Sequence, residues 1–195
     1  MRENEQPIVL FKKWFREEMA LTKVRIPTAV CLSTNGIDDY PNARFVSLKE
    51  IIDEAFIITG PVKSQKGKEI EKNKKVALTF WWTETERQVR IQGKAAYISD
   101  KLADKYFQER SRESQLLSIL SDQGEVLKSR HDLEKKFEAF EANFEGKVLK
   151  RPKEWGGFYI TPYRIELFEF KESRFHERRL FTKKKGEWEF KELQA

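Results

Sequence analysis

The stretch KKVALTFWWTETERQVRIQGKAAYIS, residues 74–99, decides the fold. It contains two runs rich in β-branched and aromatic residues, 74–82 and 87–99, on either side of the polar segment TETE. Two such runs joined by a few turn-forming residues are typical of a β-hairpin. We therefore predict two antiparallel strands at the centre of the chain.

Similar runs lie on both sides of this hairpin. Upstream, three short β-rich runs are separated by turn residues such as NGIDDYPN, which predicts an antiparallel meander. Downstream, three more runs follow the segment RPKEWGG. The predicted strands outside the hairpin are TAVCLST (28–34), ARFVSLKEI (43–51), EAFIITG (54–60), GFYITPYRIELFEF (157–170), RFHERRLFT (174–182) and EWEFKEL (187–193).

Helices are predicted before and between these strands. Ile8, Phe11 and Phe15 follow helical spacing near the N-terminus, and Pro7 suits a first-turn position. A short helix is predicted at 64–73, a second at 100–110 with Asp100 as its N-cap, and a longer one at 131–146. The apolar stripe of the longest helix and the residue placed to end it are Leu133, Phe137, Phe140, Phe144 and Gly146.

Groups of strands with helices between them predict an α+β fold, here a mostly antiparallel, barrel-like sheet with peripheral helices. The length of 195 residues favours one domain over residues 1–195. No run approaches the roughly 18 apolar residues of a membrane span, and the first residues lack the apolar core of a signal peptide. We therefore expect a cytoplasmic protein without a membrane contact.

Composition narrows the classes of partner and chemistry. A single cysteine, Cys31, excludes an internal disulfide, and with only two histidines we expect no metal site. The net charge of +6 favours a phosphate-bearing partner. The 32 acidic residues are interspersed among the 38 basic ones, and no RNA-recognition or zinc-finger pattern is present, so we do not expect nucleic acid.

One candidate anion site lies in the predicted strand RFHERRLFT. Alternation along a strand would place Arg174, His176 and Arg178 on one face. Arginine offers a planar donor fork and histidine titrates near neutral pH, so this face suits a planar anion. A solvated strand face is the alternative, and the segment alone does not decide between them.

A second candidate lies in KYFQERSRESQ. If the helix that begins near residue 100 continues, Tyr106, Arg110 and Ser114 recur every four residues and share one face. A phenol, a guanidinium and a hydroxyl are donors suited to a phosphate ester. An ordinary helix surface with Tyr106 half in the core is the alternative.

Two further groups of cations stand near the upstream strands. Arg44 and Lys49 are five residues apart, so a regular strand would place them on opposite faces unless it is bulged or they serve two ligands. The alternative is that both are ordinary surface cations at the edges of a core strand, without a ligand. Lys63, Lys66 and Lys68 precede or open a helix, where backbone amides and lysines favour an anion, although no P-loop pattern is present.

Six segments become specific when they are taken together: RFVSLK, SQKGKEIE, ERQVRIQGKA, YFQERSRESQ, WGGF and RFHERR. In this order and spacing, the chain resembles the pyridoxamine 5'-phosphate oxidase family over nearly its whole length. The resemblance implies a split β-barrel and a homodimer with FMN at the subunit interface. It also implies the oxidation of pyridoxamine 5'-phosphate and pyridoxine 5'-phosphate to pyridoxal 5'-phosphate, with O2 as acceptor and H2O2 as product.

The resemblance also implies roles for single residues. Arg174 would hold the pyridine ring and assist proton removal, and His176 would position the substrate, as the catalytic pair. Lys49 would serve both ligands. The implied substrate-binding residues are Lys49, Tyr106, Arg110, Ser114, Arg174 and His176. The implied FMN-binding residues are Arg44, Phe45, Val46, Ser47, Leu48, Lys49, Ile58, Thr59, Gln65, Lys66, Gln88, Gln123, Gly124, Phe168 and Arg178.

Three positions depart from the family pattern. The family's SRK is SQK here, so Gln65 replaces an arginine, and Lys63 is the neighbouring cation placed to compensate. The usual tryptophan before the RxH element is Phe168, and the QS pair ends in Gly124. Each hydrogen bond to a charged phosphate that is lost in this way would cost about 1.5–3 kcal/mol in affinity.

Three other functions remain open at this point. Another flavin oxidase or reductase of the split-barrel group, such as a phenazine-pathway relative, would keep the FMN residues without needing the substrate-phosphate residues. A barrel that binds flavin or a B6 vitamer without turnover is a second alternative. A basic nucleic-acid-binding module would show salt-sensitive binding and no flavin.

Overall fold

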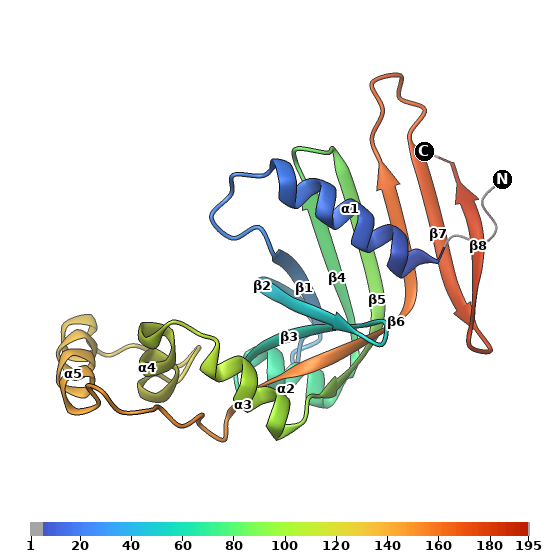
Figure 1. Cartoon of the computed structure of the whole chain (residues 1–195). Helices are drawn as coiled ribbons and strands as arrows, with labels where there is room; N and C mark the ends of the chain where they lie inside the picture. The colour runs from blue at the N-terminus through green and yellow to red at the C-terminus, as the bar shows by residue number, and fades with distance from the viewer. Residues whose placement is uncertain (1–5, 195) are drawn as a thin grey trace.

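The computed structural model describes residues 6–194, and its centre is one antiparallel sheet of eight strands (Figure 1). The strands run in the order β3-β2-β1-β4-β5-β6-β7-β8, and β3 also pairs with β6. This extra pairing closes β1 to β6 into a barrel, from which β7 and β8 extend as a hairpin. The strands are β1 (Ala29–Asn35), β2 (Pro41–Ile52), β3 (Ala55–Pro61), β4 (Lys75–Trp82), β5 (Arg87–Tyr97), β6 (Trp155–Glu169), β7 (Glu177–Lys184) and β8 (Glu187–Leu193). The predicted α+β split barrel is confirmed.

The predicted central hairpin is β4 and β5, which pair from the turn outward without interruption. Alternate residues of a strand point to opposite faces. Leu78 and Phe80 of β4 and Val89 and Ile91 of β5 are accordingly fully buried in the barrel, while the residues between them face outward. The hairpin therefore supplies one wall of the main apolar core.

The long strand β6 joins the barrel to the C-terminal hairpin. Its first half pairs with β3, its second half pairs with β7, and β5 lies along most of its other edge. The meander β1-β2-β3 pairs as predicted, and it closes the barrel because β1 also pairs with β4 and β3 with β6. Because one strand is shared, the position of β7 relative to the barrel is set by backbone hydrogen bonds.

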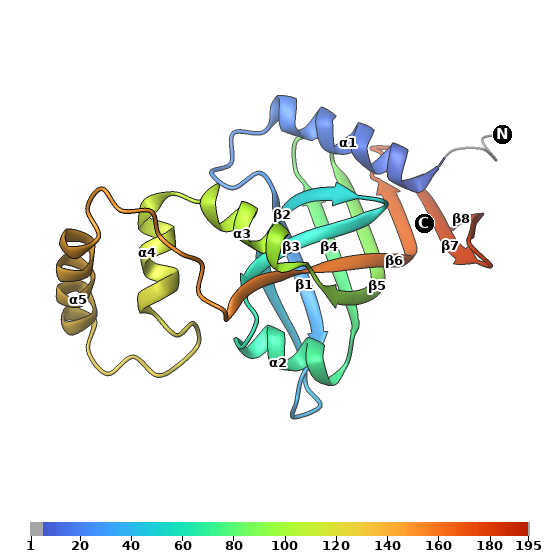
Figure 2. The same ribbon diagram turned by 60° about the horizontal axis from the view of Figure 1, so that its bottom comes forward.

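Five helices surround the sheet: α1 (Pro7–Leu21), α2 (Gln65–Lys72), α3 (Asp100–Gln108), α4 (Arg112–Leu120) and α5 (Arg130–Asn143). Figure 2 shows α1 lying across the barrel, as its predicted apolar stripe requires. Its Phe11 is fully buried, and the ring centroid lies 4.9 Å from that of Phe56 and 5.1 Å from that of Phe80. Among residues 6–194, no helix is both long and apolar enough to cross a membrane.

A lobe made of α4 and α5 stands beside the barrel (Figures 1 and 2). A second apolar core, with Phe107, Leu116 and Trp155 fully buried, lies where α3 and α4 meet the start of β6. The predicted helix at 131–146 is confirmed as α5, and its phenylalanines pack against this second core. None of the side chains of α5 is fully buried, so this helix contributes less to the fold than the others.

Two predictions about helix boundaries are wrong. The N-cap of α3 is Ser99, whose side chain accepts from the amide of Leu102, and Asp100 is the first helical residue. The helix does not continue through residues 109–111, because Ser111 caps a new helix, α4, by accepting from the amide of Ser114. An N-cap residue has non-helical dihedrals, so the chain turns there.

The strand predicted at 174–182 begins later, at Glu177. The segment before it is a turn, in which the amide of Arg174 donates to the carbonyl of Lys171 at 3.0 Å. The alternation that was predicted to place Arg174 and His176 on one strand face therefore does not apply to them. Arg178 does lie in a strand, β7.

Strand β2 has a bulge at Lys49. Leu48 lies opposite Ile58 of β3, but Glu50 lies opposite the next residue, Ile57, so Lys49 is the extra residue. A bulge breaks the two-residue alternation and re-aims the side chains around it. Strand parity had separated Arg44 from Lys49 unless a bulge intervened, and the strand has that bulge.

Candidate active site

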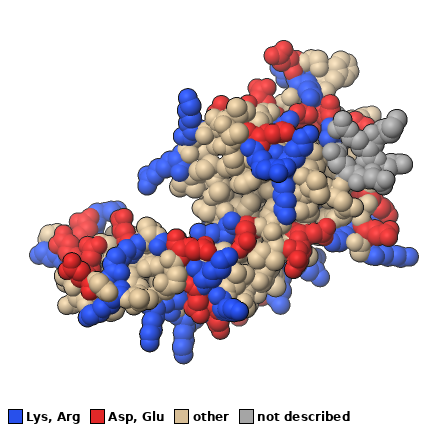
Figure 3. All heavy atoms as spheres, viewed as in Figure 1, with Lys and Arg blue, Asp and Glu red and all other residues tan. Residues whose placement is uncertain are grey.

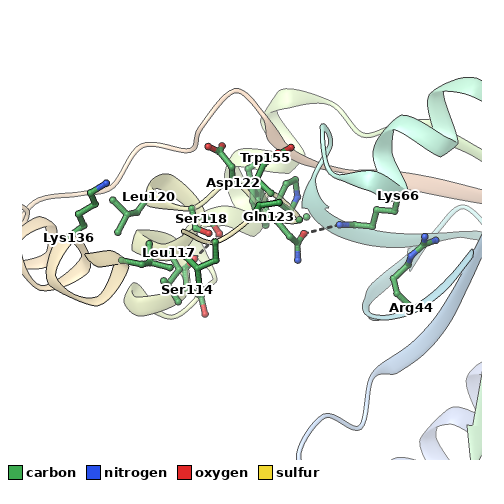
Figure 4. Close-up of a pocket in the computed structure, with 18 of the residues that line it drawn as sticks. Arg44, Lys66, Ser114, Leu117, Ser118, Leu120, Asp122, Gln123, Lys136 and Trp155 are labelled. Atoms are coloured by element: carbon green, nitrogen blue, oxygen red, sulfur yellow. Dashed lines mark hydrogen bonds between the residues drawn. The ribbon is translucent and has the colours of Figure 1, made fainter. Parts of the chain in front are cut away.

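A cleft of about 1050 Å³ lies between the barrel and the α4–α5 lobe (Figure 4). The first half of β2, the end of β3 and the first turn of α2 form one wall, and α4, the following loop and α5 form the other. The residues predicted to bind cofactor or substrate that line it are Arg44, Phe45, Val46, Thr59, Lys66, Arg110, Ser114, Gln123 and Gly124.

Lys66 is the most deeply buried cation of this cleft. It lies in the first turn of α2, only 8% of its surface is exposed, and its Nζ donates to Ser64 Oγ at 2.9 Å and to Gln123 Oε1 at 3.1 Å. No ion pair joins it to a carboxylate of residues 6–194. Burial, and then repulsion from Arg44, lower its pKa to about 8. A buried cation without a counter-charge favours the binding of an anion.

The packing of α2 explains why Lys66 is held in this place. A side chain at the following residue, Gly67, would bring its Cβ to 1.8 Å from the carbonyl oxygen of Val62. Only glycine lets the helix start pack this closely against the loop after β3. Lys66 is consequently directed back towards Gly60 and Gln123 at the cleft.

Arg44 lies on the same wall and has a carboxylate partner. Its Nη2 donates to Glu69 Oε2 at 2.8 Å, and its Nη1 donates to the hydroxyl of Thr34. Glu69 is fully buried in α2. Gln65, which was predicted to contact FMN, donates to the other oxygen of Glu69 at 3.0 Å and does not line the cleft.

Arg110 faces the cleft from the opposite wall. Its Nη2 donates to the carbonyl of Ser114 at 3.3 Å, and its guanidinium lies 5.2 Å from the ring centroid of Trp155. Its Nε is buried and has no hydrogen-bond partner within the described chain, and burial lowers the pKa of the side chain. Buried polar atoms are rarely left without a partner, so this nitrogen favours a ligand.

The remaining predicted residues on this side of the molecule do not line the cleft. Leu48 and Ile58 are buried in the barrel core, and Lys49 is exposed at the bulge. Tyr106 is 2% exposed, and its hydroxyl donates to Glu50. Burial, followed by Glu50, raises the pKa of Tyr106. The predicted trio therefore meets only in part, with Arg110 and Ser114 at the cleft and Tyr106 behind it.

A second group of predicted residues lies near the start of β5, the end of β6 and the start of β7. Gln88 of β5 is opposite Phe168 of β6, which is opposite Arg178 of β7. Directly opposite residues share a face, so these three form a row. The guanidinium of Arg178 lies 5.1 Å from the ring centroid of Phe168 and donates to Glu166 Oε1 at 2.7 and 3.0 Å.

The predicted catalytic pair stands beside this row, in the turn before β7. His176 Nδ1 accepts from the amide of Lys171 at 3.0 Å, so its Nε2 carries the proton when the ring is neutral. The ring packs against Phe168 and Phe170. Arg174 is exposed and has a φ of 64°, a left-handed conformation that is uncommon outside glycine and costs energy. Such conformations cluster at functional sites.

The two groups are far apart within one chain. Figure 1 shows the turn between β6 and β7 at the opposite end of the molecule from α4 and α5. A single chain thus places the cleft with Lys66 and Arg110 at one end, and Arg174 and His176 beside their row at the other. On the face shown in Figure 3, basic and acidic side chains are interspersed, without a broad patch of one sign.

Sequence reasoning missed three residues of the cleft region. Glu69 holds Arg44, Ser118 accepts from Arg110 at 3.4 Å, and Trp155 packs under the guanidinium of Arg110. The motif WGGF contained Trp155, but nothing in the sequence paired it with a residue 45 positions earlier. Glu69 is four residues after Gln65, a helical spacing that was available as a signal.

Comparison with known proteins shows to which family the chain belongs. A family model described as pyridoxamine 5'-phosphate oxidase matches residues 17–144. The chain belongs to the pyridoxamine 5'-phosphate oxidase family. A second model of this group, the C-terminal dimerisation region of pyridoxine 5'-phosphate oxidase, matches residues 155–195. The predicted resemblance is confirmed, and Phe168, Arg174, His176 and Arg178 all lie within the dimerisation region.

Individual relatives agree with this assignment. The pyridoxine/pyridoxamine 5'-phosphate oxidase of Flavobacterium johnsoniae is 42% identical over 178 residues, which are 91% of this chain and 83% of that protein. The protein of the same name from Leptospira biflexa is 40% identical over 182 residues, 93% of this chain and 85% of that protein. Among solved structures, PhzG from Burkholderia lata in complex with tetrahydrophenazine-1-carboxylic acid has a TM-score of 0.91 and 27% identity, covering 97% of this chain and 93% of that one.

Proposed function

We propose that this protein is an FMN-dependent oxidase of pyridoxine 5'-phosphate and pyridoxamine 5'-phosphate. Pyridoxine 5'-phosphate and O2 would give pyridoxal 5'-phosphate and H2O2; the amine would also consume water and release ammonia. The observation that carries the proposal is a pair of cations in one cleft, the buried Lys66 and the half-buried Arg110. Neither has a carboxylate partner among residues 6–194. Together they fit two phosphate-bearing ligands in a family whose relatives act on phosphorylated B6 vitamers.

The residues of the cleft fit FMN. Lys66, Arg44 and Thr59 line one wall at the start of α2, where lysine, guanidinium, hydroxyl and backbone amide donors suit a phosphate. Gln123, which accepts from Lys66, has an amide NH2 group that remains a donor for the same ligand. Bound FMN would supply the redox chemistry, by taking a hydride from C4' of the vitamer and passing the electrons to O2.

The chain's own residues would bind and orient the substrate. Arg110 and Ser114 would hold its phosphate from the wall opposite Lys66, so that binding energy remote from the reacting carbon aligns that carbon. Arg174 would hold the pyridine ring and assist removal of a proton. His176, whose Nε2–H is directed by the bond at Nδ1, would donate to the substrate.

We further propose a homodimer with the active site at the subunit interface. The segment that matches a dimerisation region contains Arg174, His176 and Arg178. In the folded subunit, the turn before β7 lies at the opposite end of the molecule from the α4–α5 lobe that borders the cleft. A two-fold dimer would set the row of one subunit against the cleft of the other. This arrangement would complete two equivalent sites, each with residues from both chains.

The test is direct. The purified protein is examined for flavin absorbance, supplied with FMN, and given pyridoxine 5'-phosphate in air while pyridoxal 5'-phosphate and H2O2 are measured. We expect a yellow protein and equal amounts of both products. A colourless protein that takes up no FMN would refute the proposal.

A second candidate is a flavin oxidase of phenazine precursors, and the likeness to PhzG favours it. The curated relatives at 40–42% identity favour the B6 reaction over it. The two functions differ in the substrate phosphate, which the phenazine acid lacks. If the second candidate is correct, the yellow protein oxidises a dihydrophenazine acid, leaves pyridoxine 5'-phosphate unchanged, and is unaffected by loss of Arg110.

A further inference from the structure

Glu69 is the most completely buried charged side chain among residues 6–194. The proposed reaction does not by itself assign it a role. It has no exposed surface and does not line the cleft. Four side chains from three elements donate to its carboxylate: Thr34 of β1 at 2.5 Å, Asn42 of β2 at 2.5 Å, Arg44 of β2 at 2.8 Å and Gln65 of α2 at 3.0 Å. A buried carboxylate with this many donors is fully satisfied and rigidly held.

The contacts place Arg44 between this carboxylate and the cleft. Arg44 lines the cleft and its side chain is 25% exposed, whereas Glu69 lies behind it. The hydroxyl of Thr34 accepts from Arg44 and donates to Glu69, which closes a three-membered ring of hydrogen bonds. A guanidinium has five N–H donors. Two are used in this ring, so three remain for a ligand in the cleft.

The charges of the cleft wall explain why a carboxylate is needed there. Arg44 and Lys66 are close enough for Arg44 to oppose the charged form of Lys66. If both the ligand and Glu69 were absent, Arg44 and Lys66 would repel each other. The flexible side chain of Arg44 would then turn away from the wall into water. The Glu69 carboxylate offsets this repulsion and fixes the guanidinium in one orientation before any anion arrives.

We propose that Glu69 is a positioning residue of the FMN site, which acts through Arg44 by holding its guanidinium in the orientation that binds the cofactor phosphate. The inference rests on the proposed FMN function. It makes a counter-intuitive prediction, because removal of a negative charge beside an anion site would ordinarily tighten anion binding. If the carboxylate positions Arg44, its removal weakens FMN binding.

A double-mutant cycle tests this on the full-length apo-protein. The dissociation constant for FMN is measured by quenching of flavin fluorescence for the wild type, Glu69→Gln, Arg44→Met and the double variant. We expect each single variant to bind FMN about 10- to 100-fold more weakly, the effect of losing a charge-assisted hydrogen bond. We expect the double variant to resemble Arg44→Met, because Glu69 has no effect except through Arg44.

Two further variants separate positioning from general stability. Glu18→Gln changes another buried glutamate, 3% exposed, which accepts from the amide and hydroxyl of Thr85 far from the cleft. We expect it to lower the melting temperature without changing FMN affinity. Thr34→Val keeps the side-chain volume and removes only the hydroxyl that links Arg44 to Glu69. It should weaken FMN binding several-fold, and it tests the inference if Glu69→Gln does not fold.

The outcomes are distinct. If the wild type binds no FMN, the proposed function and the inference both fall. If the wild type binds FMN and either Glu69→Gln or Thr34→Val binds it as tightly or more tightly, the inference alone is wrong. Additive losses in the double variant would also overturn it, because Glu69 would then act without Arg44.

Discussion

Replacement of Lys66 by methionine should stabilise the protein without cofactor and weaken its binding of FMN. The pKa of Lys66 is lowered from 10.5 to about 8, chiefly by burial. This difference corresponds to roughly 3 kcal/mol by which the fold disfavours the charged lysine. Methionine has a similar length and no charge, so this penalty disappears at pH 7.

Two hydrogen bonds of the lysine, to Ser64 and Gln123, are lost in the same substitution. At about 1 kcal/mol each, they offset part of the gain. We expect Lys66→Met to stabilise the apo-protein by about 1–2 kcal/mol, a rise of a few degrees in Tm. FMN affinity should fall about 10- to 100-fold, because the charge-assisted bond to its phosphate is lost. Thermal unfolding and FMN fluorescence quenching measure the two effects.

The pH dependence gives an independent check of the sign. Below pH 8, Lys66 is charged in both the folded and the unfolded chain, and the full penalty is present. Between about pH 8 and 10.5 the unfolded chain binds more protons than the folded one, so the wild type gains stability relative to Lys66→Met as the pH rises. The advantage of Lys66→Met should therefore disappear as the pH rises above 8 and reverse in favour of the wild type by about pH 10, because the roughly 3 kcal/mol penalty that is relieved exceeds the variant's gain of about 1–2 kcal/mol.

Lys68→Met is the matched control, since Lys68 is an exposed lysine of the same helix. It should change neither Tm nor FMN affinity by a measurable amount. If Lys66→Met is less stable than the wild type at pH 7, the buried charge carries no penalty and the reasoning is wrong. Unchanged FMN affinity in Lys66→Met would remove Lys66 from the site.

Other predictions follow from the same geometry. Arg174→Ala should lower kcat strongly and leave its FMN affinity within a few-fold of the wild-type value. Arg179→Ala should retain turnover, and equal activity of the two variants would contradict the role of Arg174. Arg110→Met should raise KM for phosphorylated vitamers about 10- to 100-fold, the loss of a charge-assisted bond to phosphate, with FMN affinity unchanged in a fluorescence titration. For the wild type, FMN affinity should decrease as the pH rises through about 8, because neutral Lys66 no longer attracts the phosphate.

Most of the fold was predictable because its helices and strands follow from local sequence patterns. The central hairpin, the meander and the first helix each depend on residues that are neighbours in the sequence, and all three form as predicted. The breaks in pattern were harder. Helical spacing alone predicted one helix that continues past residue 110. Instead, α3 ends at Gln108, and the side chain of Ser111 caps a new helix, α4.

The site was predictable in its members and not in its arrangement. Nine of the predicted ligand-binding residues do line one cleft. Their partners could not be predicted, because the ring of Thr34, Arg44 and Glu69 joins two strands and a helix across 35 positions. The turn that carries Arg174 and His176 was misread as a strand, since a left-handed arginine has no signature in composition.

The unpaired charges connect these observations with function. Among the residues that the structure describes, Arg44 has a buried carboxylate, whereas Lys66 and Arg110 face the same cleft without one. A fold selected for stability alone would neutralise all three or place them in water. A ligand that binds only the folded chain relieves the penalty, and its binding free energy adds to the stability of the fold. FMN should therefore raise Tm more in the wild type than in Lys66→Met, even though the variant is the more stable protein before the cofactor is added.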